Sequence, residues 1–284
     1  LKGALMEIIV ARHAGFCFGV ERAIDIVKDA AKEYNHVVTF GPIIHNPQVV
    51  GELKEAGVAT IKSLDEVSKD MSVVIRSHGI ERTEAEYLAE NAGNVVDAAC
   101  PFVKKAQIAA ARLSKSCDYI VILGESDHPE VKGIVSYIDI PYKVIESAEE
   151  ASALDYMEKY GFLAQTTQSI SIFENAVEKL KHKCSELAIA RTICSATEKR
   201  QEAAIEVASK VEVMIVVGGK NSANTTRLYH LCKEICPNTY HVETVAELRV
   251  DMFQGISKVG LTAGASTPTY LLEKVREYIL EVAR

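Results

Sequence analysis

The sequence predicts an α/β protein made of three pseudo-equivalent domains, each built on a parallel sheet. Short apolar segments of strand length alternate with amphipathic helical segments along the 284 residues, which is the pattern of parallel sheets covered on both faces. The chain also repeats itself three times, with one cysteine at the same point of each repeat. Its composition, 48% apolar and 25% charged, is ordinary for a globular protein long enough for several domains.

The spacing of three glycines defines the repeat. Each glycine lies 24 residues after a cysteine, and a further polar residue lies 28 residues after that cysteine. The cysteines are Cys17, Cys100 and Cys194, the glycines are Gly41, Gly124 and Gly218, and the polar residues are His45, His128 and Ser222. Three equal offsets favour a fixed structural unit over coincidence. We therefore expect three domains, over residues 1–93, 94–186 and 187–284.

Each predicted domain opens with a strand and contains three more. Short runs of β-branched and aliphatic residues, bounded by polar residues or glycine, identify these strands. They are Glu7–Arg12, His36–Phe40, Val58–Ile61 and Ser72–Arg76, then Asn94–Asp97, Tyr119–Leu123, Tyr142–Ile145 and Phe162–Ala164, and finally Leu187–Arg191, Val213–Val217, Tyr240–Val242 and Lys258–Thr262. In the first domain, amphipathic spacing predicts helices over Val20–Tyr34, Gln48–Ala56 and Glu81–Asn91.

The polar residues that follow these strands indicate where a ligand binds, because ligands of open α/β sheets bind beyond the carboxyl ends of the strands. The residues there are His45, His78, His128, Thr166, Thr167, Ser222 to Asn224 and Ser266. We expect the three domains to present these edges to one shared centre. The loop GGKNSANT lacks the ending of a P-loop, which argues against nucleotide binding.

Charge and hydropathy exclude several classes of function. The net charge of −7 and the lack of a basic stripe argue against nucleic-acid binding. No apolar run approaches the roughly 18 residues of a membrane span, and the N-terminal segment has no signal-peptide pattern. Seven cysteines, an odd number, fit a reducing cytoplasm and a metal or catalytic use. Met6 is expected to be the native start.

Cys17, Cys100 and Cys194 are the predicted metal ligands. Each stands at the start of a predicted helix, where free amides and the helix dipole stabilise a thiolate. Three such thiolates suit an iron–sulfur cluster with one iron left open, since clusters usually take four cysteines. Packing in the core is the commoner fate of a single free cysteine, and we expect it for the four without a symmetric place. These are Cys117, Cys184, Cys232 and Cys236.

The remaining candidates suit the binding of an anion and the transfer of a proton. Histidines in loops with Ser, Asn and Thr neighbours form an anion cradle, to which helix N-termini add amide donors. Glu130 is the acidic residue within reach of these histidines. In a partly apolar pocket its carboxyl group has a raised pKa and donates a proton, but a solvated Glu in the first turn of a helix fits its position equally well. Thr166 is either a site residue or a strand-end hydroxyl.

These residues lie in segments that closely resemble the 4-hydroxy-3-methylbut-2-enyl diphosphate reductase family, the last enzymes of the non-mevalonate isoprenoid pathway. The matching segments are AGFCFGVERA, GPIIHNPQVV, IRSHGI, DAACPFVKK, GESDHPEVKG, AQTTQS, ICSATEKRQ, GGKNSANTTRL and TAGASTP. They run from residue 14 to residue 268, and together they are highly specific.

The resemblance implies a trefoil of three α/β domains around a 4Fe–4S cluster with one iron free of protein ligands. Cys17, Cys100 and Cys194 would hold the cluster. Glu130 would relay protons, and Thr166 would hydrogen-bond the substrate hydroxyl and order the relay. The substrate would be bound by His45, His78, His128, Thr166, Ser222, Ala223, Asn224 and Ser266. Ala223 stands where the family often has Ser, so its contact must come from the backbone amide, and Ala99 replaces a common Thr.

The predicted function is a reductive dehydroxylation that gives isopentenyl and dimethylallyl diphosphate. The substrate is a small allylic diphosphate whose hydroxyl oxygen would meet the open iron as a Lewis acid, and the electrons would come from a donor such as ferredoxin or flavodoxin. We expect a cytoplasmic enzyme that binds neither nucleic acid nor membrane. Two alternatives stay open: a redox-sensing iron–sulfur protein, and a dehydratase similar to quinolinate synthase, which would consume no electrons.

Overall fold

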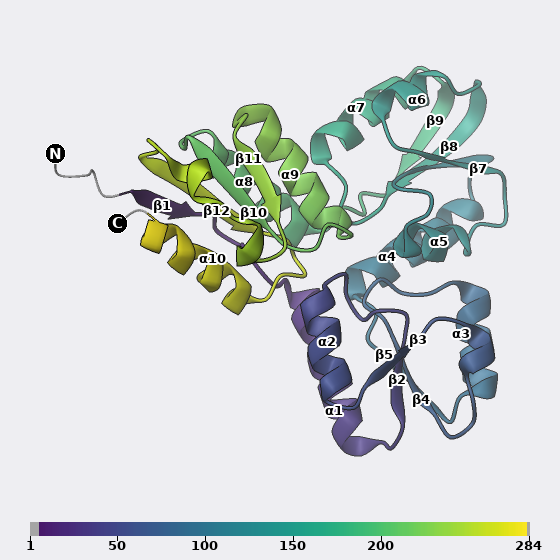
Figure 1. Cartoon of the computed structure of the whole chain (residues 1–284). Coiled ribbons are helices and arrows are strands. Elements are labelled where there is room, and N and C mark those ends of the chain that lie inside the picture. Colours follow the sequence, from purple (N-terminus) through teal and green to yellow (C-terminus); the bar gives the residue numbers. More distant parts are fainter. Residues whose placement is uncertain (1–5, 283–284) are drawn as a thin grey trace. The chain divides into compact units, whose positions relative to one another are not determined.

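The structure, a computed structural model, describes residues 6–282. Leu1–Leu5, which the predicted start at Met6 would exclude, lies outside the described residues. Twelve strands of the described chain form three four-stranded parallel sheets (Figure 1), so the predicted α/β class is confirmed. The first sheet has the order β3 (Ala59–Ile61), β2 (Val37–Phe40), β4 (Ser72–Ile75), β5 (Asn94–Asp97); the second has β7 (Tyr142–Ile145), β6 (Tyr119–Leu123), β8 (Met157–Ala164), β9 (Cys184–Ile189); the third has β1 (Glu7–Val10), β12 (Lys258–Ala263), β10 (Val213–Val217), β11 (Thr239–Val242).

The predicted strands are all present, and the largest difference in their bounds is at β8. This strand begins at Met157 and not at Phe162, because Met157 and Lys159 pair with Cys184 and Glu186 of β9. The polar residues in this half of the strand conceal it from a search for apolar runs.

The opening strand of each repeat lies in the sheet of another repeat. In register, Ser72 of β4 pairs with Asn94 of β5, and Glu7 of β1 pairs with Lys258 of β12. Likewise β9 pairs with β8. The predicted boundaries at residues 93/94 and 186/187 therefore describe the sequence repeat and not the sheets, because each sheet takes an edge strand from a neighbouring repeat.

Helices connect the strands, and the three predicted in the first repeat are present as α1 (Phe18–Glu33), α2 (Pro47–Glu55) and α3 (Arg82–Asn91). The others are α4 (Pro101–Ser114), α5 (Pro129–Val135), α6 (Ala148–Ser152), α7 (Ile170–Lys181), α8 (Ser195–Ala208), α9 (Ala223–Ile235) and α10 (Thr269–Val282), with short 3-10 turns η1 (Leu64–Glu66), η2 (Val245–Glu247) and η3 (Val250–Phe253). Among the described residues, no helix is long and apolar enough to cross a membrane.

The three repeat glycines have the same structural role. Each follows the central strand β2, β6 or β10 and donates its amide to the last residue of the neighbouring strand. The pairs are Gly41 with Ile61 at 2.8 Å, Gly124 with Ile145 at 2.9 Å and Gly218 with Val242 at 2.9 Å. The equal offsets in the sequence thus correspond to equal hydrogen bonds in the sheets.

The chain divides into two compact units. Unit 1 comprises Leu1–Phe18, His45–Val49 and Ser195–Arg284 and holds the third sheet, whereas unit 2 comprises Gly19–Ile44 and Val50–Cys194 and holds the other two. Ile215 and Leu261 are fully buried in the core of unit 1. In unit 2 the rings of Phe162 and Phe173 stack with centroids 4.8 Å apart. Burial of such aliphatic and aromatic groups stabilises each unit.

Candidate active site

Cys17, Cys100 and Cys194 occupy equivalent positions. Each comes directly before the first residue of a long helix, α1, α4 or α8, and each donates its amide to the carbonyl two residues beyond the end of a strand. The pairs are Cys17 with Ala265 at 3.1 Å, Cys100 with Ser77 at 2.9 Å and Cys194 with Thr166 at 2.9 Å. The expectation that these cysteines stand at helix N-termini is confirmed, and the first amides of each helix lie close to the sulfur.

The other cysteines have surroundings that favour packing. Cys232 and Cys236 belong to the core of unit 1, and burial raises the pKa of the Cys232 thiol to about 12. All seven cysteines are free of disulfides. In the described part of the chain, no three His, Cys, Asp or Glu side chains form a group that could hold a metal ion. Cys17 belongs to unit 1, whereas Cys100 and Cys194 belong to unit 2, so the three-cysteine cluster stays a proposal.

Unit 1 brings together several of the predicted diphosphate ligands. Ser222 is the N-cap of α9 and accepts the Thr225 amide at 3.4 Å. The Ser266 hydroxyl lies 3.3 Å from the His45 carbonyl oxygen, to which it donates, and 3.4 Å from the Ser222 hydroxyl. All three residues lie around the N-terminus of α9, which begins at Ala223 and offers free amides to an anion.

Asn224 is a buried polar group at this helix end. Its side chain is 5% exposed, and neither its amide oxygen nor its amide nitrogen has a hydrogen-bond partner among the described residues. Leaving such a group unsatisfied costs about 1–3 kcal/mol. A polar ligand at the N-terminus of α9 would remove this cost.

Unit 2 holds the predicted proton donor in a buried pair. Glu130 is 2% exposed, and the Thr166 amide donates to its Oε1 at 2.6 Å while the Thr166 hydroxyl donates to its Oε2 at 3.0 Å. Burial raises the pKa of Glu130 to about 7, although the two Thr166 hydrogen bonds oppose the shift. The solvated alternative for Glu130 is therefore wrong, because the side chain is enclosed.

Two predicted histidines flank this pair. His128 is the N-cap of α5 and its Nδ1 accepts the Glu130 amide at 3.1 Å. This bond assigns the proton of the neutral ring to Nε2, which is then a donor. The rings of His78 and His128 meet edge to face with centroids 5.6 Å apart. Unit 2 thus gathers His78, His128, Glu130 and Thr166 close to the Cys194 amide, which binds the Thr166 carbonyl.

Sequence reasoning missed Gln165. It is fully buried, its Oε1 accepts the Glu125 amide at 3.1 Å, and its Nε2 has no partner among the described residues. Its position next to Thr166 in AQTTQS was the available signal, but a Gln at a strand end is usually a surface residue.

Comparisons with known proteins identify the family of the chain. The family model described as LytB protein matches residues 8–280. Curated relatives named 4-hydroxy-3-methylbut-2-enyl diphosphate reductase include one from Geobacter sulfurreducens, 48% identical over 276 residues that cover 97% of this chain and 98% of the relative. Another, from Geotalea uraniireducens, is 47% identical over 98% of both chains.

Solved structures with the same description are also similar. A structure described as (E)-4-hydroxy-3-methyl-but-2-enyl diphosphate reductase, the terminal enzyme of the non-mevalonate pathway, matches with a TM-score of 0.70 and 42% identity, covering 97% of this chain and 99% of that one. The E-1-hydroxy-2-methyl-but-2-enyl-4-diphosphate reductase of Plasmodium falciparum matches with a TM-score of 0.89 and 27% identity, covering 96% and 87%.

The similar sequences and structures, together with the three parallel sheets, define the chain as an oxidoreductase. The chain belongs to the LytB family, in which the curated relatives are 4-hydroxy-3-methylbut-2-enyl diphosphate reductases. The resemblance stated from the sequence motifs and the prediction of an enzyme are both confirmed.

Gly219 is expected to tolerate no side chain, because a Cβ there would lie 2.7 Å from the His45 carbonyl oxygen. We predict that Gly219→Ala displaces the His45 loop and lowers the free energy of unfolding by about 1–3 kcal/mol. The matched control is Gly51→Ala within α2, where a Cβ meets no atom within 4 Å; it should raise stability by about 0.5–1 kcal/mol. Urea unfolding of both variants is the measurement, and equal stability of the two would contradict the assignment.

Proposed function

We propose that the protein reduces 4-hydroxy-3-methylbut-2-enyl diphosphate to isopentenyl and dimethylallyl diphosphate at a 4Fe–4S cluster held by Cys17, Cys100 and Cys194. The observation that carries the proposal is the connection from a proton donor to a cysteine. Glu130 accepts two hydrogen bonds from Thr166, whose carbonyl accepts the Cys194 amide. The names of the relatives support the substrate and the pathway.

The donor set fits an iron–sulfur cluster with one open iron. None of the three cysteines forms a disulfide, each precedes a helix, and each has its amide fixed by an equivalent hydrogen bond. Thiolate sulfur at helix N-termini is the ligand type that such clusters require. When bound, the cluster would supply electrons and a Lewis-acidic iron to the substrate hydroxyl.

The diphosphate is held by neutral donors and helix-end amides in this proposal. Asn224, with its buried amide, would bind a diphosphate oxygen, together with the Ala223 amide, Ser222 and Ser266. His45, His78 and His128 would add imidazole donors. The basic residues of these loops are engaged elsewhere: Lys220 pairs with Glu247, and the Arg76 Nε donates to the Gly79 carbonyl at 3.1 Å.

Glu130 would donate the proton that the reaction needs, and Thr166 would transfer it to the substrate. Replacing the hydroxyl group by hydrogen consumes two electrons and two protons, and it releases water. A C–O bond breaks, and a C–H bond forms at either end of the allyl group, which accounts for two products. Hydroxide leaves poorly unless it is protonated. A carboxyl group with a pKa of about 7 is partly protonated at neutral pH and can donate this proton. The Thr166 hydroxyl would bind the substrate hydroxyl and pass the proton from Glu130.

The reductase needs a one-electron donor, which we propose to be a ferredoxin or flavodoxin. We also infer a cytoplasmic location, which seven cysteines outside any disulfide support, since thiols persist in reducing compartments. The alternative of a redox sensor gives no role to the buried Glu130–Thr166 pair or to Asn224. The alternative of a dehydratase differs in consuming no electrons.

The test of this function is turnover by protein purified and assayed without oxygen. Reduced methyl viologen should be oxidised only when the allylic diphosphate is added, with two electrons consumed for each molecule converted. Both products should be detected. Loss of water from the substrate without oxidation of the dye, and without these two products, would favour the dehydratase. A cluster without any turnover would favour the sensor.

Substitutions in the diphosphate site should weaken binding. We expect His45→Asn, His78→Asn and Ser266→Ala each to cost about 1–3 kcal/mol of binding free energy, the value of a lost hydrogen bond to a charged group. Calorimetric titration with the cluster intact measures the effect, and Ser209→Ala, on the exposed end of a helix, is the control. Unchanged affinity in all three variants would mean that the diphosphate binds elsewhere.

A further inference from the structure

One or two residues before each proposed cluster ligand lies a residue that is held by a hydrogen bond to a distant part of the sequence. The Arg200 Nη2 donates to the Gly15 carbonyl at 2.7 Å, two residues before Cys17. The Arg22 Nη1 donates to the Ala99 carbonyl at 3.2 Å, one residue before Cys100. Thr192 lies two residues before Cys194, and its hydroxyl donates to the Ala164 carbonyl at 2.5 Å. Two of the three tethers are thus guanidinium groups.

Arg200 is a buried charge. It is 2% exposed and lies on α8, the helix that begins directly after Cys194. Its partner Gly15 has a φ of 97°, a left-handed backbone that only glycine adopts readily. Glycine has more conformational freedom to lose than any other residue, so contacts are needed to fix this part of the loop. The bond from Arg200 provides one such constraint on the loop that carries Cys17.

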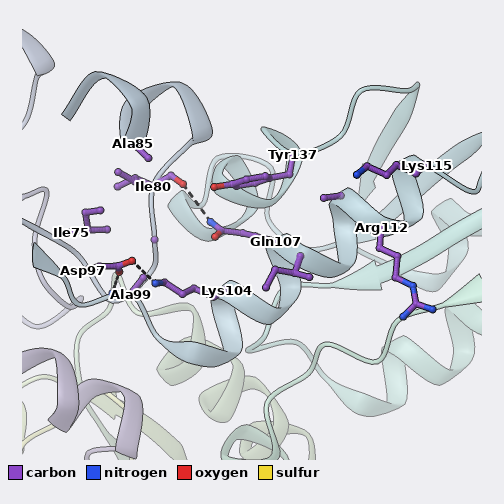
Figure 2. A pocket seen from close by; sticks show the side chains of 13 residues that line it. Ile75, Ile80, Ala85, Asp97, Ala99, Lys104, Gln107, Arg112, Lys115 and Tyr137 are labelled. Atoms are coloured by element: carbon purple, nitrogen blue, oxygen red, sulfur yellow. Dashed lines mark hydrogen bonds and ion pairs between the residues drawn. The ribbon is translucent and has the colours of Figure 1, made fainter. Parts of the chain in front are cut away.

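Arg22 makes the corresponding bond within unit 2. It lies on α1, the helix that begins directly after Cys17. The Ala99 peptide that it holds is also fixed on its other side, because the Ala99 amide donates to Asp97 Oδ1 at 2.9 Å. Asp97 is in turn paired with Lys104 of α4 (Figure 2).

Ala99 lies between the core of its sheet and a cavity. Asp97, Ala99 and Lys104 line a cavity of about 570 Å³ (Figure 2). Ala99 is nevertheless buried in the core of its sheet, so the hydrogen bonds act together with packing. The Arg22 bond, the Asp97 bond and the Cys100 amide bond to Ser77 hold the two peptides that precede the cysteine.

The two arginines occupy related places in the repeat. Arg22 lies five residues after Cys17 and reaches the loop of Cys100, while Arg200 lies six residues after Cys194 and reaches the loop of Cys17. Each guanidinium therefore connects the helix behind one cysteine to the loop before the next. The corresponding residues of the second repeat are Lys105 and Ala106, and there Thr192 supplies the tether from the loop itself.

We propose that Arg22 and Arg200 are positioning residues of the reductase, which fix the loops of Cys100 and Cys17 and raise the reduction potential of the bound cluster. The inference rests on the proposed cluster. A guanidinium remains charged at every relevant pH and donates several hydrogen bonds in a fixed plane. A fixed positive charge close to a thiolate ligand favours the reduced, more negative state of the cluster, more so where the charge is buried.

The test compares Arg200→Gln, Arg200→Lys, Arg22→Gln and Arg22→Lys with wild type. Arg276→Gln is the control, because the ion pair of Arg276 with Glu273 is exposed and lies outside the cysteine loops. Three quantities are measured without substrate: the midpoint potential of the cluster, its electron paramagnetic resonance spectrum when reduced, and the rate of iron loss to a chelator. The Gln variants should have a more negative potential, an altered spectrum and iron loss faster by about tenfold, the factor expected for one lost charged hydrogen bond.

The Lys variants separate charge from geometry. They retain the positive charge but lose the planar guanidinium group with its fixed donors. The midpoint potential of the cluster should therefore stay closer to wild type, while iron loss is still accelerated. Circular dichroism of the apoprotein shows whether each variant folds. If a Gln variant fails to fold, the Lys variant at the same position is measured in its place. Wild-type potential, spectrum and rate of iron loss in the folded variants would overturn the inference, even if their melting temperatures fell. Wild-type protein that binds no cluster would instead overturn the proposed function.

Discussion

Replacing Cys17, Cys100 or Cys194 by Ser should abolish the cluster and all turnover, while Ser at any other cysteine should leave both intact. The three residues share a position before a helix and an equivalent amide hydrogen bond. A serine oxygen is a poor substitute for the thiolate ligand of iron. Iron content, sulfide content and visible absorption of the variants, purified without oxygen, measure the effect.

The matched controls for this experiment are Cys117→Ser, Cys184→Ser, Cys232→Ser and Cys236→Ser. Burial of Cys232 and Cys236 in the core of unit 1 means that these two variants should lose some stability, but not iron. Loss of the cluster from any control that keeps its fold would contradict the assignment of ligands by symmetry.

Glu130→Gln should bind substrate but lose turnover by at least about 10²–10⁴-fold, the usual contribution of general acid catalysis. The amide keeps the shape of the side chain. Its single oxygen can still accept the Thr166 amide, which donates to Glu130 Oε1 at 2.6 Å in the wild type, while its NH2 group can donate to the Thr166 hydroxyl oxygen. It has no acidic proton to give. Rates of dye oxidation measure turnover, and the spectrum of the cluster with substrate reports binding.

The pH dependence gives a second test of Glu130. Because burial raises its pKa to about 7, the carboxyl group carries its proton below pH 7 and loses it above. Wild-type turnover should therefore fall as the pH rises through about 7, and the residual activity of Glu130→Gln should lack this step. Asp127→Asn, whose side chain is fully exposed in the same loop, is the control. Near-normal turnover in Glu130→Gln would assign the proton to another group.

The repeat could be predicted because equal offsets reflect equal hydrogen bonds. Gly41, Gly124 and Gly218 each close the same contact between neighbouring strands, which requires a fixed length of chain between them and the cysteines. The exchange of edge strands could not be predicted in this way. Periodicity identifies a strand such as Asn94–Asp97, but it does not say which sheet edge the strand joins.

The site was predictable as a set of residues and less so as a set of interactions. Motif resemblance selected Glu130 and Thr166, but only the structure shows that Thr166 donates two hydrogen bonds to Glu130 and that burial raises the pKa of this carboxyl group. Arg22 and Arg200 were missed because an arginine in the early turns of a helix is usually solvated. Their partners, Ala99 and Gly15, are backbone carbonyls, which leave no signal in the sequence.

The central claim is that three cysteines hold a cluster whose fourth iron receives the substrate. Mössbauer spectroscopy of ⁵⁷Fe-labelled protein, recorded with and without the allylic diphosphate, tests it most directly. We predict four irons per chain, with the signal of one iron changed by the substrate and those of the other three unchanged. Iron-free protein that still turns over, or four equivalent irons that do not respond to substrate, would contradict the account.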